Sequence, residues 1–173
     1  VESSTNYVSL TGFNTWPYAD WTTAATNIQD AIDAQVVGGV VLVAPGTYES
    51  GQYVRDGIPN RIGIYKPMTV MASNQNPVLT VIRGRKIGGT NTIRCAYVGS
   101  GSSLVGFTLT NGLTKSGGDV IKEQSGGGVW CEDDGVVSNC IISGNNAAPS
   151  GSEGCGGGVY GGTVFNCTIA NNK

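Results

Sequence analysis

The chain contains no histidine, and only 13% of its 173 residues are charged. Because histidine is the side chain that ordinarily changes charge near neutral pH, its absence removes the commonest general base. The net charge of -2 provides no basic surface for nucleic acid or for an anionic membrane. The longest apolar run, Val40 to Ala44, is far too short to cross a bilayer. We therefore expect neither a nucleic-acid partner nor membrane insertion.

The five cysteines lack the CxxC spacing of a zinc site or a redox pair. Together with the low charge and the many Ser, Thr, Asn and Gly residues, they favour an exported protein, extracellular or at a cell surface, with one or two disulfides. The chain begins at Val1 rather than Met, as expected of a mature product whose targeting segment has been removed. Buried thiols that pack as small apolar side chains are the alternative. The candidates for disulfide bonding are Cys131, Cys155, Cys140 and Cys167.

Glycine is abundant, with 28 residues, and two glycine-rich phrases repeat each other. The phrase "GGGVWCEDDGVVSNCIISGNN" begins at Gly126, and "GGGVYGGTVFNCTIANNK" begins at Gly156. An earlier copy, "RCAYVGSGSSLVGFTLTNG", begins at Arg94, and a fainter one, "IYKPMTVMAS", begins at Ile64. The glycine runs suit corners that need positive φ or a close backbone approach. Self-similarity at a period of about 20 to 50 residues is typical of stacked architectures.

Each copy contains short stretches, such as "VVSNCIIS" and "TVFNCTIA", in which β-branched residues alternate with polar ones. These stretches predict strands separated by turns. About three strands per repeat, stacked in parallel at about 4.8 Å, give an all-β fold, a right-handed parallel β-helix of about four to five coils. Asn139 and Asn166 are expected to hydrogen-bond from coil to coil. The alternation places these side chains inside the tube: Phe107, Leu109, Val137, Cys140, Ile142, Cys167 and Ile169.

One segment departs from the strand pattern. "TNIQDAIDA" has Ile28, Ala31 and Ile32 at helical spacing, and Thr26 with Gln29 matches a capping box. We predict a helix over residues 26–35 that covers the apolar end of the first coil. The chain is then a single domain, in which a lead-in segment (1–25) and the helix precede the coils (36–173).

The stretch "TNIQDAIDAQVVGGVVLVAPGTY" resembles the entry to the pectate-lyase-like superfamily of right-handed parallel β-helices, in which a capping helix leads into the first coil. The preceding "YVSLTGFNTWPYADWTTAA" is similar to the lead-in of large bacterial extracellular surface proteins with such repeats. The resemblance covers essentially the whole chain. It implies the fold and leaves the activity open, since the superfamily includes lyases, hydrolases, esterases, adhesins and structural proteins.

Lyase activity, as the resemblance implies it, needs an Arg or Lys base and carboxylates that hold calcium against an acidic sugar. The only acidic cluster in the repeats is Glu132, Asp133 and Asp134, a weak calcium candidate in a turn, with a solvated turn as the alternative. Asp133 and Asp134 are adjacent, so on a strand they would face opposite sides and could not act as an acid/base pair. We therefore assign no catalytic residue, and calcium is the only cofactor considered.

Aromatic residues are the remaining candidates for binding. Tyr97, Trp130 and Tyr160 share one column of the repeat. If this column faces outward, it suits stacking on a polysaccharide or on another subunit. If it faces inward, it fills the core.

The C-terminal coil has no predicted helix or run of charges to cover it, and an uncovered coil is a row of unpaired backbone groups. We therefore expect a non-catalytic structural subunit that stacks head to tail with copies of itself in a filament or surface layer, its final coil covered by a neighbour's N-terminal segment. The alternative is a carbohydrate-active, polysaccharide lyase-like enzyme, or a carbohydrate-binding or adhesin module of a longer surface protein. The expected interface residues are Tyr7, Val8, Leu10, Phe13, Val164, Phe165, Thr168 and Ile169.

Overall fold

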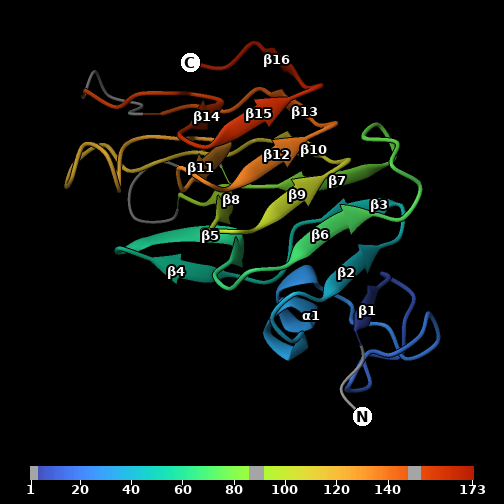
Figure 1. Cartoon of the computed structure of the whole chain (residues 1–173). Coiled ribbons are helices and arrows are strands. Elements are labelled where there is room, and N and C mark those ends of the chain that lie inside the picture. The colour runs from blue at the N-terminus through green and yellow to red at the C-terminus, as the bar shows by residue number, and fades with distance from the viewer. Residues whose placement is uncertain (1–3, 86–91, 148–152) are drawn as a thin grey trace.

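The computed structural model describes residues 4–85, 92–147 and 153–173. It confirms the predicted fold class: the chain is a parallel β-helix of about four turns, with one short helix in the described ranges. Figure 1 shows the coils stacked along one axis, with the N-terminus and α1 (Ile28–Ala34) at one end and the C-terminus at the other. No helix in the described ranges has the length and apolar character needed to cross a membrane.

Three sheets form the walls of the tube, and every strand pairing is parallel except that of β4 with β5. Sheet A runs in the order β1 (Thr5–Val8), β2 (Val40–Val43), β6 (Thr69–Ala72), β9 (Ser103–Val105), β12 (Val136–Ser138) and β15 (Thr163–Phe165). Sheet B contains β3 (Gly46–Tyr48), β7 (Thr80–Arg83), β10 (Thr108–Thr110), β13 (Ile141–Ser143) and β16 (Thr168–Ala170). Sheet C contains β4 (Tyr53–Arg55), β5 (Ile58–Ile64), β8 (Arg94–Val98), β11 (Val129–Cys131) and β14 (Val159–Tyr160).

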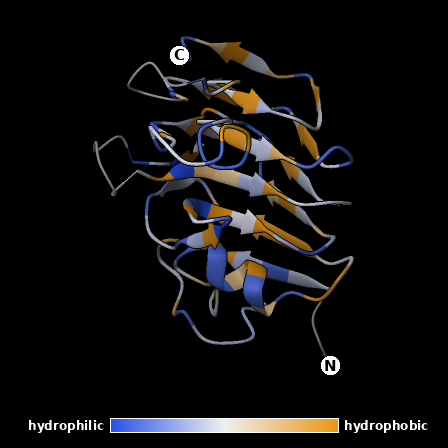
Figure 2. Ribbon diagram, turned by 90° about the vertical axis from the view of Figure 1, so that its left-hand side faces the viewer, coloured by the Kyte–Doolittle hydropathy of each residue, from blue (hydrophilic) through white to orange (hydrophobic). Residues whose placement is uncertain are grey.

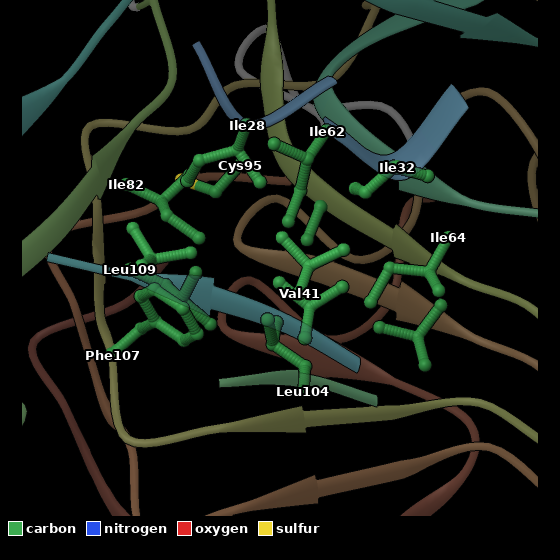
Figure 3. Packing of buried hydrophobic residues seen from close by; sticks show 14 of the residues in the cluster. Ile28, Ile32, Val41, Ile62, Ile64, Ile82, Cys95, Leu104, Phe107 and Leu109 are labelled. Atoms are coloured by element: carbon green, nitrogen blue, oxygen red, sulfur yellow. The ribbon is translucent and has the colours of Figure 1, made fainter. Parts of the chain in front are cut away.

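The predicted columns are confirmed by the register of the strands. Val137 pairs with Leu104 and Val164, and Ile142 pairs with Leu109 and Ile169. Apolar side chains from the three sheets converge on the axis of the tube (Figure 3). Hydrophobic strand segments recur in every coil up to the C-terminal one (Figure 2). The alternation in the sequence therefore reports directly which side chains form the core.

The capping helix is shorter than predicted, and its N-cap is Asn27 rather than Thr26. Asn27 Oδ1 accepts a hydrogen bond from the Asp30 N–H at 3.0 Å, and Asn27 Nδ2 donates to Asp30 Oδ2 at 2.7 Å. Gln29 does not close a capping box because its side chain is buried against Gly63 of β5, whose N–H donates to Gln29 Oε1 at 2.8 Å. The amide of Gln29 therefore joins the helix to sheet C.

The short corner between sheets A and B keeps the same length in the last three coils. It consists of two residues in each of the last three coils: Gly106-Phe107, Asn139-Cys140 and Asn166-Cys167. The first residue of each corner has φ between 51° and 84°, a left-handed conformation that favours Gly and Asn. Asn166 Nδ2 donates to Asn139 Oδ1 at 3.3 Å, which confirms the predicted hydrogen bond between coils.

A second asparagine ladder lies inside the tube. Asn145 is fully buried, and its Nδ2 donates to Asn172 Oδ1 and to the Leu109 carbonyl, both at 3.0 Å. The Gly112 N–H donates to Asn145 Oδ1 at 2.8 Å. This amide thus binds two backbone groups of the preceding coil and the Asn172 side chain of the following one, and such partners spare a buried polar side chain a large desolvation cost.

Candidate functional site

The outer face of sheet C carries a continuous stack of five aromatic rings, which we call the aromatic ladder: Tyr65, Tyr53, Tyr97, Trp130 and Tyr160. Successive ring centroids lie 5.3, 6.0, 5.7 and 5.9 Å apart, with interplanar angles of 10° to 28°. The predicted column Tyr97, Trp130 and Tyr160 is confirmed by strand register. It lies outside the tube, because the neighbouring residues on these strands, such as Ala96 and Val129, belong to the buried core.

In the middle of the ladder, Tyr97 and Trp130 also contact other parts of the chain. Tyr97 is buried, its hydroxyl donates to Glu132 Oε1 at 2.8 Å, and the Arg55 guanidinium lies 5.2 Å from its ring centroid. Burial raises the pKa of Tyr97, and the hydrogen bond to Glu132 raises it further. The Trp130 Nε1–H donates to the Ile121 carbonyl at 2.9 Å. The Tyr97 hydroxyl and the Trp130 indole N–H thus each have a partner within the chain.

This geometry limits what the ladder can bind. A sugar ring stacks on the face of an aromatic ring, but the faces of Tyr53, Tyr97 and Trp130 are occupied by neighbouring rings. Within the described residues, Tyr160 contacts one other ring, so one of its faces remains open toward the C-terminal end. The ladder therefore supports the stacking of coils, and at its C-terminal end Tyr160 offers one face to a further ring or a ligand.

Gly63 makes room for the ladder at Tyr53. Gly63 pairs with Tyr97 in the sheet, so its side-chain position lies on the outer face, where the β4–β5 hairpin folds back. A Cβ at Gly63 would lie 1.9 Å from Tyr53 Cδ1, closer than any real contact. Glycine is therefore required here by the ring that covers it.

We predict that Gly63→Ala displaces Tyr53 from the ladder and lowers the free energy of unfolding by about 1–3 kcal/mol, the usual cost of overpacking. Equilibrium denaturation gives the energy, and near-ultraviolet circular dichroism reports the lost ring stacking. Gly117→Ala is the matched control, because nothing lies within 4 Å of a Cβ at Gly117. Equal stability of the two variants would contradict the prediction.

The predicted calcium cluster is not assembled as a site. Glu132 accepts the Tyr97 hydroxyl, whereas Asp133 and Asp134 are exposed. In the ranges that the structure describes, no three His, Cys, Asp or Glu side chains come together to hold a metal ion. The acidic turn is absent from the next coil, where Gly161 and Gly162 occupy the place of residues 131–135. The second glycine-rich phrase is therefore three residues shorter than the first over this part.

No disulfide joins any of the five cysteines, all of which the structure describes. Cys131 is buried, and burial raises its pKa to about 12. Cys155 is exposed, so the candidate partners Cys131 and Cys155 lie in different surroundings. Cys140 and Cys167 do approach each other, because the Cys140 N–H donates to Cys167 Sγ at 3.3 Å. The disulfides expected from the sequence are therefore not formed here, and only one pair is placed to form one.

The interface residues expected from the sequence fall into two groups. Val8 is fully buried and pairs with Val43 of β2, so it is a core residue and not the surface residue that an interface requires. Tyr7 packs edge-on against Trp21, with centroids 4.7 Å apart. The exposed residues are Leu10 and Phe13 at the N-terminal end, and Phe165, Thr168 and Ile169 at the C-terminal end, with Val164 only partly buried.

The loop between β10 and β11 is held by one buried arginine, which the sequence analysis did not identify. Arg94 Nη2 donates to the carbonyls of Lys122 and Ser125 at 2.9 and 2.7 Å, and its Nη1 donates to Asn60 Oδ1 at 3.3 Å. Burial lowers the pKa of Arg94 to about 9, so the guanidinium remains charged at neutral pH. Its position gives it a structural role, because its Nη1 and Nη2 groups donate to main-chain carbonyls and to an amide.

A shallow cavity of about 350 Å³ lies beside the helix. Its lining residues come from the lead-in segment and from α1: Trp16, Tyr18, Asp30, Asp33 and Ala34. The Asp30 carboxylate accepts from Asn27, and Asp33 accepts from Gln29 Nε2 at 2.9 Å. Both carboxylates thus take part in holding the helix.

Comparison of the chain with protein-family models, with curated proteins and with solved structures gives no match.

Proposed function

We propose that the chain is a non-catalytic, extracellular structural protein whose β-helix stacks head to tail with further copies, as in a filament or surface layer. The observation that carries this proposal is the C-terminal coil. Within the described residues, the outer edges of β14, β15 and β16 have no strand partner. Ile169 is 51% exposed, whereas Ile142, one coil inside, is fully buried. Such an edge is a template for another polypeptide.

The opposite end supplies apolar side chains rather than a strand. β1 is occupied on both edges. β2 pairs with one edge, and on the other the Tyr7 N–H donates to the Tyr18 carbonyl while the Tyr7 carbonyl accepts from the Ala25 N–H. A neighbour's N-terminal segment therefore meets the C-terminal coil with its exposed lead-in surface, and not with β1 itself. Phe13 is 76% exposed and Trp16 is 72% exposed, an arrangement that favours contact with the exposed Phe165 and Ile169.

The proposal includes a place in the pectate-lyase-like superfamily of right-handed β-helices, supported by the capping helix and the first coil that follows it. That superfamily contains both enzymes and structural proteins, so the fold alone does not decide the activity. The alternative of a polysaccharide lyase-like or sugar-binding module gains no support in the described ranges. The ring faces of Tyr53, Tyr97 and Trp130 are occupied by neighbouring rings, and the guanidinium groups of Arg61 and Arg94 bind main-chain carbonyls.

We predict that the purified chain forms assemblies whose mass grows with concentration, measured by light scattering and negative-stain electron microscopy. Ile169→Lys is expected to abolish assembly, because it places a charge on the exposed end of the tube. The folded monomer tolerates this change, since Ile169 is already half exposed.

Val78→Lys is the matched control, because Val78 is 66% exposed in a corner away from both ends of the tube. This variant is expected to assemble as the unmodified chain does. An unmodified chain that stays monomeric at all concentrations, or an Ile169→Lys variant that assembles equally well, rules out stacking through this coil.

A further inference from the structure

The corner between sheets A and B contains a column that the proposed stacking does not use. Phe107, Cys140 and Cys167 occupy the same position in three successive coils, as the second residue of each corner. The flanking strands fix this alignment, since Thr108 pairs with Ile141, and Ile141 pairs with Thr168. Phe107 and Cys140 are buried, and Cys167 is partly buried.

In this column, the main-chain N–H of the corner residue donates to a cysteine sulfur of the next coil and not to a carbonyl oxygen. The Phe107 N–H donates to Cys140 Sγ at 3.4 Å, and the Cys140 N–H donates to Cys167 Sγ at 3.3 Å. The two thiols lie close enough for each to affect the pKa of the other. Each sulfur is thereby turned toward the preceding coil, so the Cys140 and Cys167 side chains lie on the same side of the corner.

The spacing of the two coils matches the needs of a disulfide. Neighbouring strands of a sheet lie about 4.8 Å apart, and disulfides join Cα atoms about 4.4 to 6.8 Å apart. A bond between in-register residues of two stacked coils therefore needs rotation about the side-chain bonds and no movement of the tube.

The two thiols differ in access and in reactivity. Hydrogen bonds from the Cys140 side chain and main chain lower the pKa of Cys167 below the usual cysteine value. The interaction with Cys167, together with burial, raises the pKa of Cys140. Cys167 is thus the accessible thiolate that attacks first, and Cys140 is the buried thiol that reacts second.

We propose that Cys140 and Cys167 form a reversible disulfide that cross-links their two coils, by exchange with a low-molecular-weight disulfide RSSR. The Cys167 thiolate attacks one sulfur of RSSR, forms a mixed disulfide and releases RS⁻. Cys140 then loses its proton and attacks Cys167 Sγ, which releases the second RS⁻. Both leaving groups take up protons, so two protein thiols are oxidised to one disulfide while RSSR is reduced to two RSH.

The test uses the full chain carrying Cys155→Ser, which removes the exposed thiol, with oxidised glutathione as RSSR at neutral pH. A Glu-specific protease cleaves after Glu132 and Glu153, so Cys140 and Cys167 fall in different peptides. Mass spectrometry is expected to show these two peptides joined, with the loss of two hydrogens. The yield is expected to be independent of protein concentration, unlike stacking, because the bond is intramolecular.

Two serine variants in this background separate the two steps. With Cys140→Ser, Cys167 is expected to retain a glutathionyl group, because the second thiol is missing. With Cys167→Ser, glutathionylation of Cys140 is expected to be at least about tenfold lower than that of Cys167 in the Cys140→Ser variant, since Cys140 is buried. The proposal is overturned if Cys167 retains glutathione while Cys140 is present, if Cys131 is the partner, or if neither thiol reacts.

Discussion

Phe107→Ala is expected to lower the free energy of unfolding by about 3–5 kcal/mol, the range for removing a buried Phe side chain. Phe107 is fully buried and points into the core from the corner after β9 (Figure 3). Its ring lies in the column that continues with Cys140 and Cys167, whose small side chains cannot fill the space left behind. Denaturation in urea, followed by circular dichroism, measures the change.

Phe13→Ala is the control for this prediction, because the Phe13 side chain is 76% exposed. Its expected effect on the free energy of unfolding is within about 0.5 kcal/mol, as for most surface substitutions. A Phe107→Ala variant no less stable than the control would show that Phe107 is not a core residue of the folded protein.

Arg94→Met is expected to lower the free energy of unfolding by about 3 kcal/mol. The change leaves the Lys122 and Ser125 carbonyls and the Asn60 amide without their donor, and each unsatisfied acceptor costs about 1 kcal/mol or more. Methionine retains most of the apolar volume, so the loss comes mainly from these hydrogen bonds. The loop between β10 and β11 is expected to open first, since Arg94 holds two of its carbonyls. Limited proteolysis after Lys115 or Lys122 then proceeds faster, and denaturation gives the energy.

Arg83→Met separates this effect from the general loss of a positive charge. The Arg83 side chain is 45% exposed, and Arg83 Nη1 lies 3.3 Å from Glu49 Oε2, so its expected cost is below about 1 kcal/mol. The prediction for Arg94 fails if both variants lose equal stability and their loops are cleaved at equal rates.

The stacked coils could be predicted from the sequence because each column repeats a residue type at the same place in the coil. Tyr97 over Trp130, Leu104 over Val137, and Ile142 over Ile169 are each in register. In a parallel β-helix, strand alternation alone decides which side chains face inward. A repeated local pattern is therefore enough to specify both the strands and the core.

Features that depend on contacts between different coils could not be predicted in this way. The burial of Arg94 requires the loop between β10 and β11 to fold across β8, and nothing in the residues near Arg94 indicates this. The covering of Tyr97 depends on the β4–β5 hairpin, which places Tyr53 and Arg55 over its ring. Gln29 matched a capping box, but its contact with Gly63 across the tube takes precedence over the local motif.

The candidate site was predicted only in part for the same reason. The column of Tyr97, Trp130 and Tyr160 was visible in the repeat, but the repeat could not show whether it faced inward or outward. The direction was settled by Ala96 and Val129, the adjacent residues that fill the core. Val8 was expected at a surface because its segment reads as a strand at the start of the chain, and its pairing with β2 buries it.

The connections between the sheets differ in how much their lengths vary. From sheet A to sheet B, each of the last three coils uses two residues, whereas residues 84–93, 111–128 and 144–158 connect sheet B to sheet C. Every coil nevertheless advances the tube by one strand spacing, because the ladders and not the connections set the rise. The height of the molecule therefore depends on the number of coils and not on the number of residues. Insertions and deletions at the corner between sheets B and C leave the pairing of the named strands in place, so this side of the protein tolerates changes of length wherever they spare the carbonyls that bind Arg94.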